Sequence, residues 1–445
     1  MKQFFTILKN HVSILLPVIV LFIIAVINSF SNIGLVIDGP RQFFSALMVN
    51  DVFYGKEHIG NYVYIVRYFP SMIPQVSIFL SVLIGITNVK ILLTIFTFAI
   101  YCSPVIFLII LYLNIPENKK HIFNIILLSF LICFVYMKYF VLSESFLTIL
   151  FLWIVFVIYF YIDFNKLTIF NLLCLSIFSI FLFSSHPNVI IFIPFFIYVG
   201  VSKYLKTQNI CFKNNIVIIT SFLILIQAFV FNVFCIVYPF APYHEYLELT
   251  MLKDLKFIYF ILSVCFIIGL SFFKAKTNKI FIIITILVCF IICYIVINIK
   301  PVYGVFYRML NLYITIIFMG FITFISIFKN KINYTYIRIL NVMLILSLLI
   351  STVVYANKNN AFNLKIVDYI SKNKTIPVSH FIRDNVKNKN DEYAAILFLN
   401  IFPNPNFCKI EIDLNDKYHT LFINEERFKK FGMDIGQLLI IKDSK

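Results

Sequence analysis

The chain has 445 residues, of which 61% are hydrophobic and 13% are charged, and its formal net charge is +17. Apolar runs of about 17 to 24 residues recur through the first 356 positions, and helices of that length cross the roughly 30 Å hydrocarbon core of a bilayer. This pattern excludes a soluble globular protein and predicts a membrane protein with many spans. The positive residues lie in short loops between the runs, so they indicate membrane topology and not nucleic-acid binding.

The apolar runs predict eleven transmembrane helices. The first run is too long for a removable signal peptide and has no small-residue cleavage site, so it counts as a span. The segment 70–87 opens with Pro70 and Pro74 and is joined to the next span by two residues alone, so we treat it as re-entrant or lying along the membrane surface. The predicted spans lie near residues 12–30, 90–113, 121–137, 144–162, 167–184, 188–202, 215–237, 256–273, 280–298, 309–328 and 337–356.

The charges in the loops predict the orientation of the chain. The inner loops hold fourteen Lys and Arg against two acidic residues, whereas the outer loops hold nine against seven. This asymmetry places the N-terminus inside and the C-terminus outside. Abundant Phe, Ile, Lys and Asn are typical of A/T-rich coding and favour the cytoplasmic (inner) membrane of a bacterium. The inner positive residues are Lys2, Lys9, Lys119, Lys120, Lys166, Lys203, Lys206, Lys213, Lys274, Lys276, Lys279, Lys329, Lys331 and Arg338.

The last 89 residues, 357–445, are far more charged than the rest of the chain. Alternating or β-rich runs at 394–399, 409–414 and 438–441 predict strands, and they follow a predicted helix at 362–371. We therefore expect an all-α polytopic membrane bundle over 1–356, with a long first outer loop at 31–89. A small extracytoplasmic α/β domain over 357–445 would complete the chain.

A charged pair, Asp38 and Arg41, lies in the first outer loop directly after the first span. Asp38 precedes Gly39 and Pro40, so its carboxylate is placed to cap a helix that starts there. The alternative is that Asp38 is a general base that takes a proton from an acceptor hydroxyl. Both interpretations remain open from the sequence. A connection of this length is uncommon in compact bundles unless it carries function.

Four other residues on the predicted outer face are candidates for substrate binding. Arg308 follows Tyr303 at the start of the tenth span, where a guanidinium either binds phosphate oxygens or extends to the interface from a helix end. Glu144 lies at a span start, where it either stabilises the helix dipole or contacts substrate. His186 lies in a tight outer turn, either as a phosphate or sugar contact or as a solvated side chain.

The sequence has no glycine-rich nucleotide loop, no zinc-protease spacing and no nucleophile elbow. It therefore predicts neither ATP nor a redox cofactor. No metal site is predicted, although a divalent cation that assists Asp38 is left open.

The chain resembles the GT-C superfamily of membrane glycosyltransferases, which take a sugar from a polyprenyl-phosphate or dolichyl-phosphate carrier. The resemblance lies in an acid at the start of a long first outer loop, here Asp38, and in the Pro70 and Pro74 entry to the next membrane segment. The outer Ser143-Glu144-Ser145 and the soluble tail also match. Many family members carry two acids together, whereas here Gly39 follows Asp38.

The resemblance implies a sugar transfer at the outer face of the cell envelope. The carrier lipid would lie in a groove between spans, with its phosphate held by Arg308 and by Arg41 or His186. Asp38 would activate a glycan, lipid or protein acceptor, and the lipid phosphate would leave. Such a donor requires no nucleotide-binding motif.

Two other functions remain in competition. A polysaccharide or lipid transporter (flippase) usually places charges at the bilayer midplane or has paired broken helices, and the predicted spans here are nearly free of charge. A polysaccharide polymerase or ligase of the O-antigen type generally has its large outer loop late in the chain, whereas the longest loop of the membrane part here is the first. A structural assembly factor is the remaining possibility.

Overall fold

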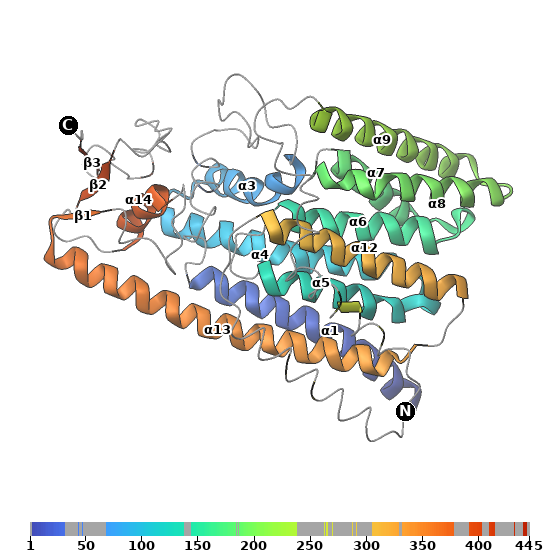
Figure 1. Ribbon diagram of the computed structural model, residues 1–445, viewed down its shortest axis with the longest axis horizontal. Coiled ribbons are helices and arrows are strands. Elements are labelled where there is room, and N and C mark those ends of the chain that lie inside the picture. The colour runs from blue at the N-terminus through green and yellow to red at the C-terminus, as the bar shows by residue number, and fades with distance from the viewer. Residues whose placement is uncertain are drawn as a thin grey trace.

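The computed structural model shows a bundle of long helices with a small parallel sheet beyond one end (Figure 1). It describes residues 2–31, 43, 47, 68–137, 144–183, 185, 187–237, 262, 264, 265, 269, 287, 291, 305–328, 332–377, 391–402, 409–413, 431 and 439–442. Every structural statement below concerns these residues.

Each predicted span outside 256–273 and 280–298 coincides with a helix, and those two fall almost entirely outside the described residues. Among the described residues, five helices are long and apolar enough to cross a membrane. The fold is therefore that of an all-α integral membrane bundle. Its α-helices are α1 (Lys2–Phe30), α3 (Tyr68–Leu83), α4 (Val89–Asn114), α5 (Phe123–Met137), α6 (Glu144–Tyr161), α7 (Ile169–Phe183), α8 (Ile193–Lys206), α9 (Phe212–Val237), α12 (Val305–Phe328) and α13 (Tyr334–Lys372). Short 3₁₀ helices are η2 (Glu117–Ile122), η3 (Phe164–Lys166) and η4 (Pro187–Ile191).

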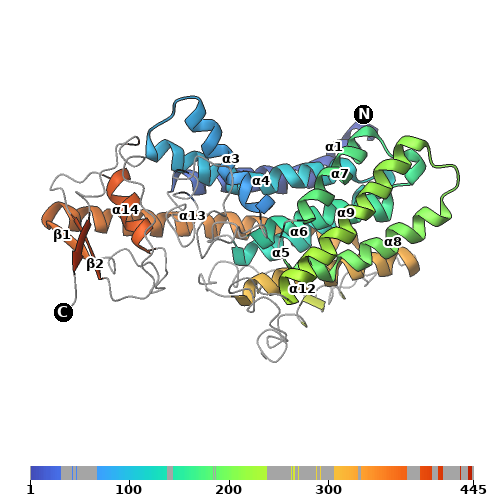
Figure 2. The same ribbon diagram turned by 90° about the horizontal axis from the view of Figure 1, so that it is seen from above.

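Helices α5 and α6 form the centre of the bundle. Nearly every residue whose burial is described in these two helices is buried, as expected of helices that are apolar on all sides. Helices α4, α7, α8 and α12 pack against α6, and α1 packs against α4 and α13 (Figure 2). The outer faces of α1, α4, α7 and α9 expose large apolar side chains, which suit contact with lipid.

Close packing in the bundle depends on aromatic contacts and on one glycine. The ring of Phe107 on α4 lies 5.2 Å from Phe151 of α6 and 5.8 Å from Phe178 of α7. At Gly200 of α8, an added Cβ would lie 2.5 Å from the ring of Phe222 and 3.1 Å from that of Tyr159. Only glycine therefore allows α8 to approach α6 and α9 this closely.

The segment 70–87 is largely helical, and its assignment as re-entrant or lying along the membrane surface stays a prediction. Helix α3 covers most of it and folds back along α4 through a turn in which Gly85 has φ +90°. Helices α1 and α4 run in opposite directions, so the end of α1 and the start of α4 lie at the same end of the bundle (Figure 1). The ring of Phe22 lies 5.8 Å from that of Phe98 in this pair.

Helix α13 runs without a break from the membrane part into the tail. Its 39 residues extend about 58 Å, well beyond the bilayer core. The helix predicted at 362–371 is the last part of α13, and the predicted domain boundary after residue 356 falls inside it. The sequence between 334 and 372 contains neither proline nor glycine, so nothing in it stops the helix at that boundary.

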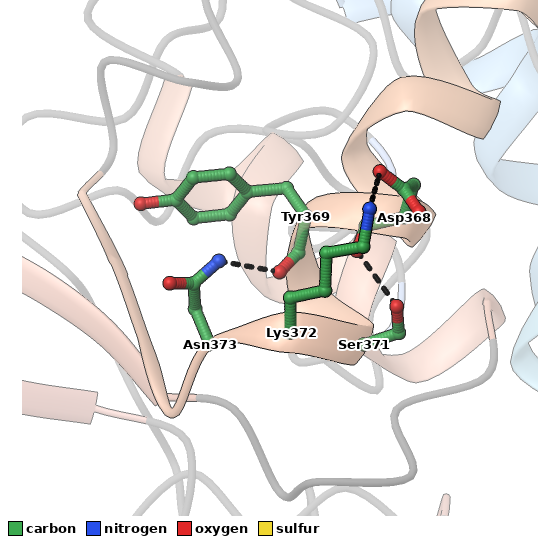
Figure 3. Close-up of polar contacts among 5 residues, drawn as sticks. All are labelled: Asp368, Tyr369, Ser371, Lys372 and Asn373. Atoms are coloured by element: carbon green, nitrogen blue, oxygen red, sulfur yellow. Dashed lines mark hydrogen bonds and ion pairs between the residues drawn. The ribbon is translucent and has the colours of Figure 1, made fainter.

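Side chains at the end of α13 pair locally (Figure 3). The Nζ of Lys372 lies 2.8 Å from Oδ2 of Asp368, and the hydroxyl of Ser371 donates to the carbonyl of Asp368 at 2.7 Å. The amide of Asn373, the residue after the helix, donates to the carbonyl of Tyr369 at 2.8 Å. These contacts satisfy carbonyls in the last turns, and the chain then enters the sheet.

The sheet has three parallel strands in the order β1-β2-β3. They are β1 (Thr375–Pro377), β2 (Lys409–Asp413) and β3 (Leu439–Lys442), so the strands predicted near 409–414 and 438–441 are confirmed. The strand predicted at 394–399 is wrong, because this segment belongs to helix α14 (Asp391–Ile401). Ala395, Ile396 and Leu399 form a buried helical face there, and parallel strands require a crossover that is usually a helix.

Candidate functional site

One end of the bundle is closed by contacts between short connections. The hydroxyl of Tyr161 lies 2.9 Å from that of Ser326, and the amide of Asn165 donates to the carbonyl of Gln208 at 3.0 Å. The rings of His121 and Tyr334 lie 4.6 Å apart. These contacts bring together segments 115–122, 163–168, 207–211 and 332–334, all in or next to predicted inner loops. We name this the hydrogen-bonded end.

Buried asparagines at the hydrogen-bonded end donate to other helices or loops. The amide of Asn171 on α7 donates to Oδ1 of Asn114 on α4 at 2.9 Å. Asn214 donates to the carbonyl of Phe164, and Asn341 donates to the carbonyl of Asn124, each at 2.8 Å. These bonds hold the helix ends together and indicate a structural role for this end of the bundle.

Glu144 and Arg308 lie at the opposite end, at one level. Helices α6 and α12 pack side by side, and Tyr161 and Ser326 meet near their C-terminal ends. Seventeen residues before Tyr161 is Glu144, the first residue of α6, and seventeen residues before Ser326 is Met309, next to Arg308. Because both helices rise about 1.5 Å per residue, Glu144 and Arg308 are at the same height in the bundle. We name this the Glu144 end.

The first outer loop is anchored at the Glu144 end by one aromatic residue. Phe43 is fully buried, and its ring lies 5.5 Å from that of Phe96 on α4. The Phe107–Phe151 contact aligns α4 with α6 and puts Phe96 about 6 Å beyond the height of Glu144. Phe43 follows Arg41 by two residues and Asp38 by five. Asp38 and Arg41 themselves lie outside the described residues.

The remaining candidates have neighbours at the Glu144 end. His186 and Tyr303 lie outside the described residues. Helix α7 ends in this half of the bundle, because Phe181 near its C-terminus contacts Phe151 in the middle of α6 with ring centroids 5.2 Å apart. Ser185, one residue before His186, is buried, and its hydroxyl lies 3.3 Å from the carbonyl of Leu182. The described neighbours of His186 therefore lie in the same half of the bundle as Glu144 and Arg308.

Sequence reasoning missed two buried asparagines in this half of the bundle. Asn28 near the end of α1 is 1% exposed, and Asn311, one turn after Arg308 on α12, is 0% exposed. In the described part of the chain, neither amide atom of either residue has a hydrogen-bond partner. The signal in the sequence is an asparagine inside an apolar run, which is weaker than the charged residues and histidines at the span ends.

The described residues include no cluster of three or more His, Cys, Asp and Glu side chains that would hold a metal ion. No protein family, no characterised protein and no solved structure matches this chain. The fold defines the class of the protein as an integral membrane helical bundle, and its activity is argued below from the Glu144 end.

Proposed function

We propose that the protein is an integral membrane glycosyltransferase. It would move a sugar from a polyprenyl-phosphate carrier to a glycan, lipid or protein acceptor outside the cytoplasm. The observation that supports this most is the height shared by Glu144 and Arg308, together with the anchoring of the first outer loop at the same end by Phe43. An acid, a base and an arginine from three distant parts of the sequence would thereby share one membrane edge.

The location suits a substrate with a lipid tail and a polar head. The bundle exposes apolar side chains such as Ile106 of α4 and Ile177 of α7, which would contact both the bilayer and a polyprenyl chain. The head of the carrier would then lie near the membrane edge, where Arg308 is in the first turn of α12. A guanidinium there binds phosphate oxygens through two parallel hydrogen bonds.

In the proposed reaction, Asp38 accepts the proton of an acceptor hydroxyl as the acceptor oxygen bonds to the anomeric carbon of the sugar. The bond between that carbon and the phosphate oxygen breaks, and the phosphate leaves with the electron pair. Arg308 stabilises the charge that develops on the phosphate. Arg41, Glu144, His186 and Tyr303 are assigned to substrate binding in this proposal.

The test is transfer of a labelled sugar from polyprenyl-phosphate carriers by purified protein in lipid. Replacement of the base, Asp38→Asn, is expected to reduce the transfer rate about 10² to 10⁴-fold. The matched control is Glu117→Gln, an acid at the hydrogen-bonded end whose side chain is 88% exposed, and this variant is expected to transfer like the wild type.

Transfer that survives Asp38→Asn would assign Asp38 to helix capping and remove the base from the mechanism. Absence of transfer by the wild type from every carrier tried would reject the glycosyltransferase proposal. Movement of an intact carrier between the leaflets of protein-containing vesicles would then identify a flippase.

A further inference from the structure

A seam of buried polar groups runs between α5 and α12 below Arg308. It consists of Ser129 and Cys133 on α5 and of Asn311 and Thr315 on α12, and all four side chains are 0% exposed. The carbonyl of Asn311 accepts from the hydroxyl of Thr315 at 2.8 Å and from Sγ of Cys133 at 3.8 Å. The backbone of Asn311 is thus paired, while its side-chain amide has no partner among the described residues.

An unpaired amide is unfavourable in the interior of a membrane protein. Neither lipid nor apolar side chains replace the hydrogen bonds that the group would make in water. Asn214 and Asn341 are also buried, yet each donates to a backbone carbonyl of another segment at 2.8 Å. Buried polar groups are normally paired in this way, and because the amide of Asn311 has no such partner among the described residues, it can pair with a bound ligand.

The position of Asn311 identifies where that partner would come from. Asn311 lies one turn after Arg308, and side chains on a helix tilt towards its N-terminus, so its amide lies over the turn that carries Arg308. This height in the bundle is also that of Glu144. A ligand bound by Arg308 at the membrane edge is therefore adjacent to Asn311.

The chemistry of the amide selects the part of the ligand. An asparagine side chain offers N–H donors and a carbonyl acceptor together. A phosphate supplies acceptors only and would leave Oδ1 of Asn311 unpaired, whereas two neighbouring sugar hydroxyls supply a donor and an acceptor. The unpaired hydroxyl of Ser129, further along the seam, adds a second group of the same kind.

We propose that Asn311 binds a pair of hydroxyls on the sugar of the lipid-linked donor, while Arg308 binds the phosphate of the same molecule. This inference rests on the proposed glycosyltransferase function and adds a residue that determines which sugar is accepted. It assigns recognition of the sugar to α12 and not to the first outer loop.

The experiment compares Asn311→Leu with Asn214→Leu, a matched change of a paired buried asparagine. Leucine has the same branched arrangement of side-chain heavy atoms as asparagine, although it is larger, and it removes the amide. Asn311→Leu is expected to unfold at a temperature no lower than the wild type, because it removes an unpaired polar group, whereas Asn214→Leu is expected to unfold at a lower temperature. Asn311→Ala serves as a second variant that adds no bulk.

The functional measurement uses a panel of polyprenyl-phosphate-linked hexoses and pentoses, with polyprenyl phosphate alone as an inhibitor. Asn311→Leu is expected to lower kcat/KM for the sugar-linked carrier at least tenfold and to leave inhibition by polyprenyl phosphate unchanged. Folded Asn214→Leu is expected to transfer at the wild-type rate.

Each outcome decides a separate question. Wild-type transfer by both Asn311→Leu and Asn311→Ala would overturn the assignment of Asn311 and leave the glycosyltransferase proposal standing. An unfolding temperature of Asn311→Leu as low as that of Asn214→Leu would show that the amide is structural, which also overturns the assignment. A wild type that accepts no carrier would reject the proposed function, and the sugar contact of Asn311 with it.

Discussion

Three buried asparagines at the hydrogen-bonded end differ from two towards the Glu144 end in how their amides are paired. At the hydrogen-bonded end, Asn171, Asn214 and Asn341 each donate to another helix or loop. Towards the Glu144 end, neither amide atom of Asn28 or Asn311 has a partner in the described part of the chain. Asn359 of α13 donates to the carbonyl of Ser31 close to Asn28, and Oδ1 of Asn341 has no partner among the described residues. The contrast therefore concerns Asn28 and Asn311, in which both amide atoms are unpaired in the described part of the chain.

The two ends also differ in the connections that the sequence predicts there. At the hydrogen-bonded end, the helices are joined by short segments such as 162–168 and 207–211, whose polar groups lie close enough to pair with each other. At the Glu144 end lies the predicted first outer loop, 31–89, whose Phe43 is buried against Phe96 of α4. Long connections between packed helices are typical of functional regions. We therefore expect variants at the Glu144 end to lose activity and variants at the hydrogen-bonded end to lose stability.

The largest effect that would sharpen this comparison is expected for Arg308→Gln. Loss of charged hydrogen bonds of about 1.5 to 3 kcal/mol to the carrier phosphate would reduce kcat/KM for transfer roughly 10 to 100-fold. The matched control is Lys119→Gln, an exposed cation in η2 at the hydrogen-bonded end. The two variants are compared by transfer of labelled sugar and by inhibition with polyprenyl phosphate. Equal losses of transfer activity in the two variants would contradict the proposed difference between the two ends.

A loss of stability is expected for Asn171→Leu. This change removes the bond to Asn114 and two bonds that Oδ1 of Asn171 accepts from Thr168, at 3.0 Å from its N–H and at 2.7 Å from its hydroxyl. We expect a decrease of about 1 to 3 kcal/mol in the free energy of unfolding, because the buried Oδ1 of Asn114 loses its partner, whereas Thr168 is exposed. Unfolding in detergent measures this change. Unchanged stability, or slower transfer by the folded variant, would contradict a purely structural role.

The smallest effect is expected for Asp368→Asn, outside both ends of the bundle. The side chains of Lys372 and Asp368 are 68% and 64% exposed, and exposed pairs four residues apart on a helix contribute about 0.3 to 0.5 kcal/mol. Unfolding at low and high salt should therefore hardly distinguish this variant from the wild type. A larger change would show that the end of α13 contributes to stability in a way that this ion pair does not explain.

The sequence predicted the helices of the membrane part well, because each must place an apolar run of similar length in the bilayer. The prediction of 90–113 differs from α4 by one residue at each end, and α6 begins at Glu144 as predicted. Short apolar runs in the tail distinguish less well between a helix and a strand. The run 394–399 has residues favoured in strands, yet its place between two parallel strands makes it the crossover helix α14.

The sequence predicted only those candidate site residues whose charge or imidazole group stands out without knowledge of their neighbours. Charges and histidines at span ends indicated the Glu144 end, and the helix directions group Glu144 with Arg308 there. Asn311 could not be distinguished from Asn214 or Asn341 in the sequence, since each is an asparagine in a largely apolar helix. The distinction arises from what the neighbouring helices offer, which depends on segments far away in the chain.

Photo-cross-linking of a polyprenyl phosphate that carries a diazirine next to its phosphate, in lipid vesicles, tests most directly that the Glu144 end binds the carrier. We expect adducts within 138–147 and 303–311, at the starts of α6 and α12, and we expect unlabelled polyprenyl phosphate to suppress them. Adducts confined to 115–122 or 163–168, at the hydrogen-bonded end, would contradict the account.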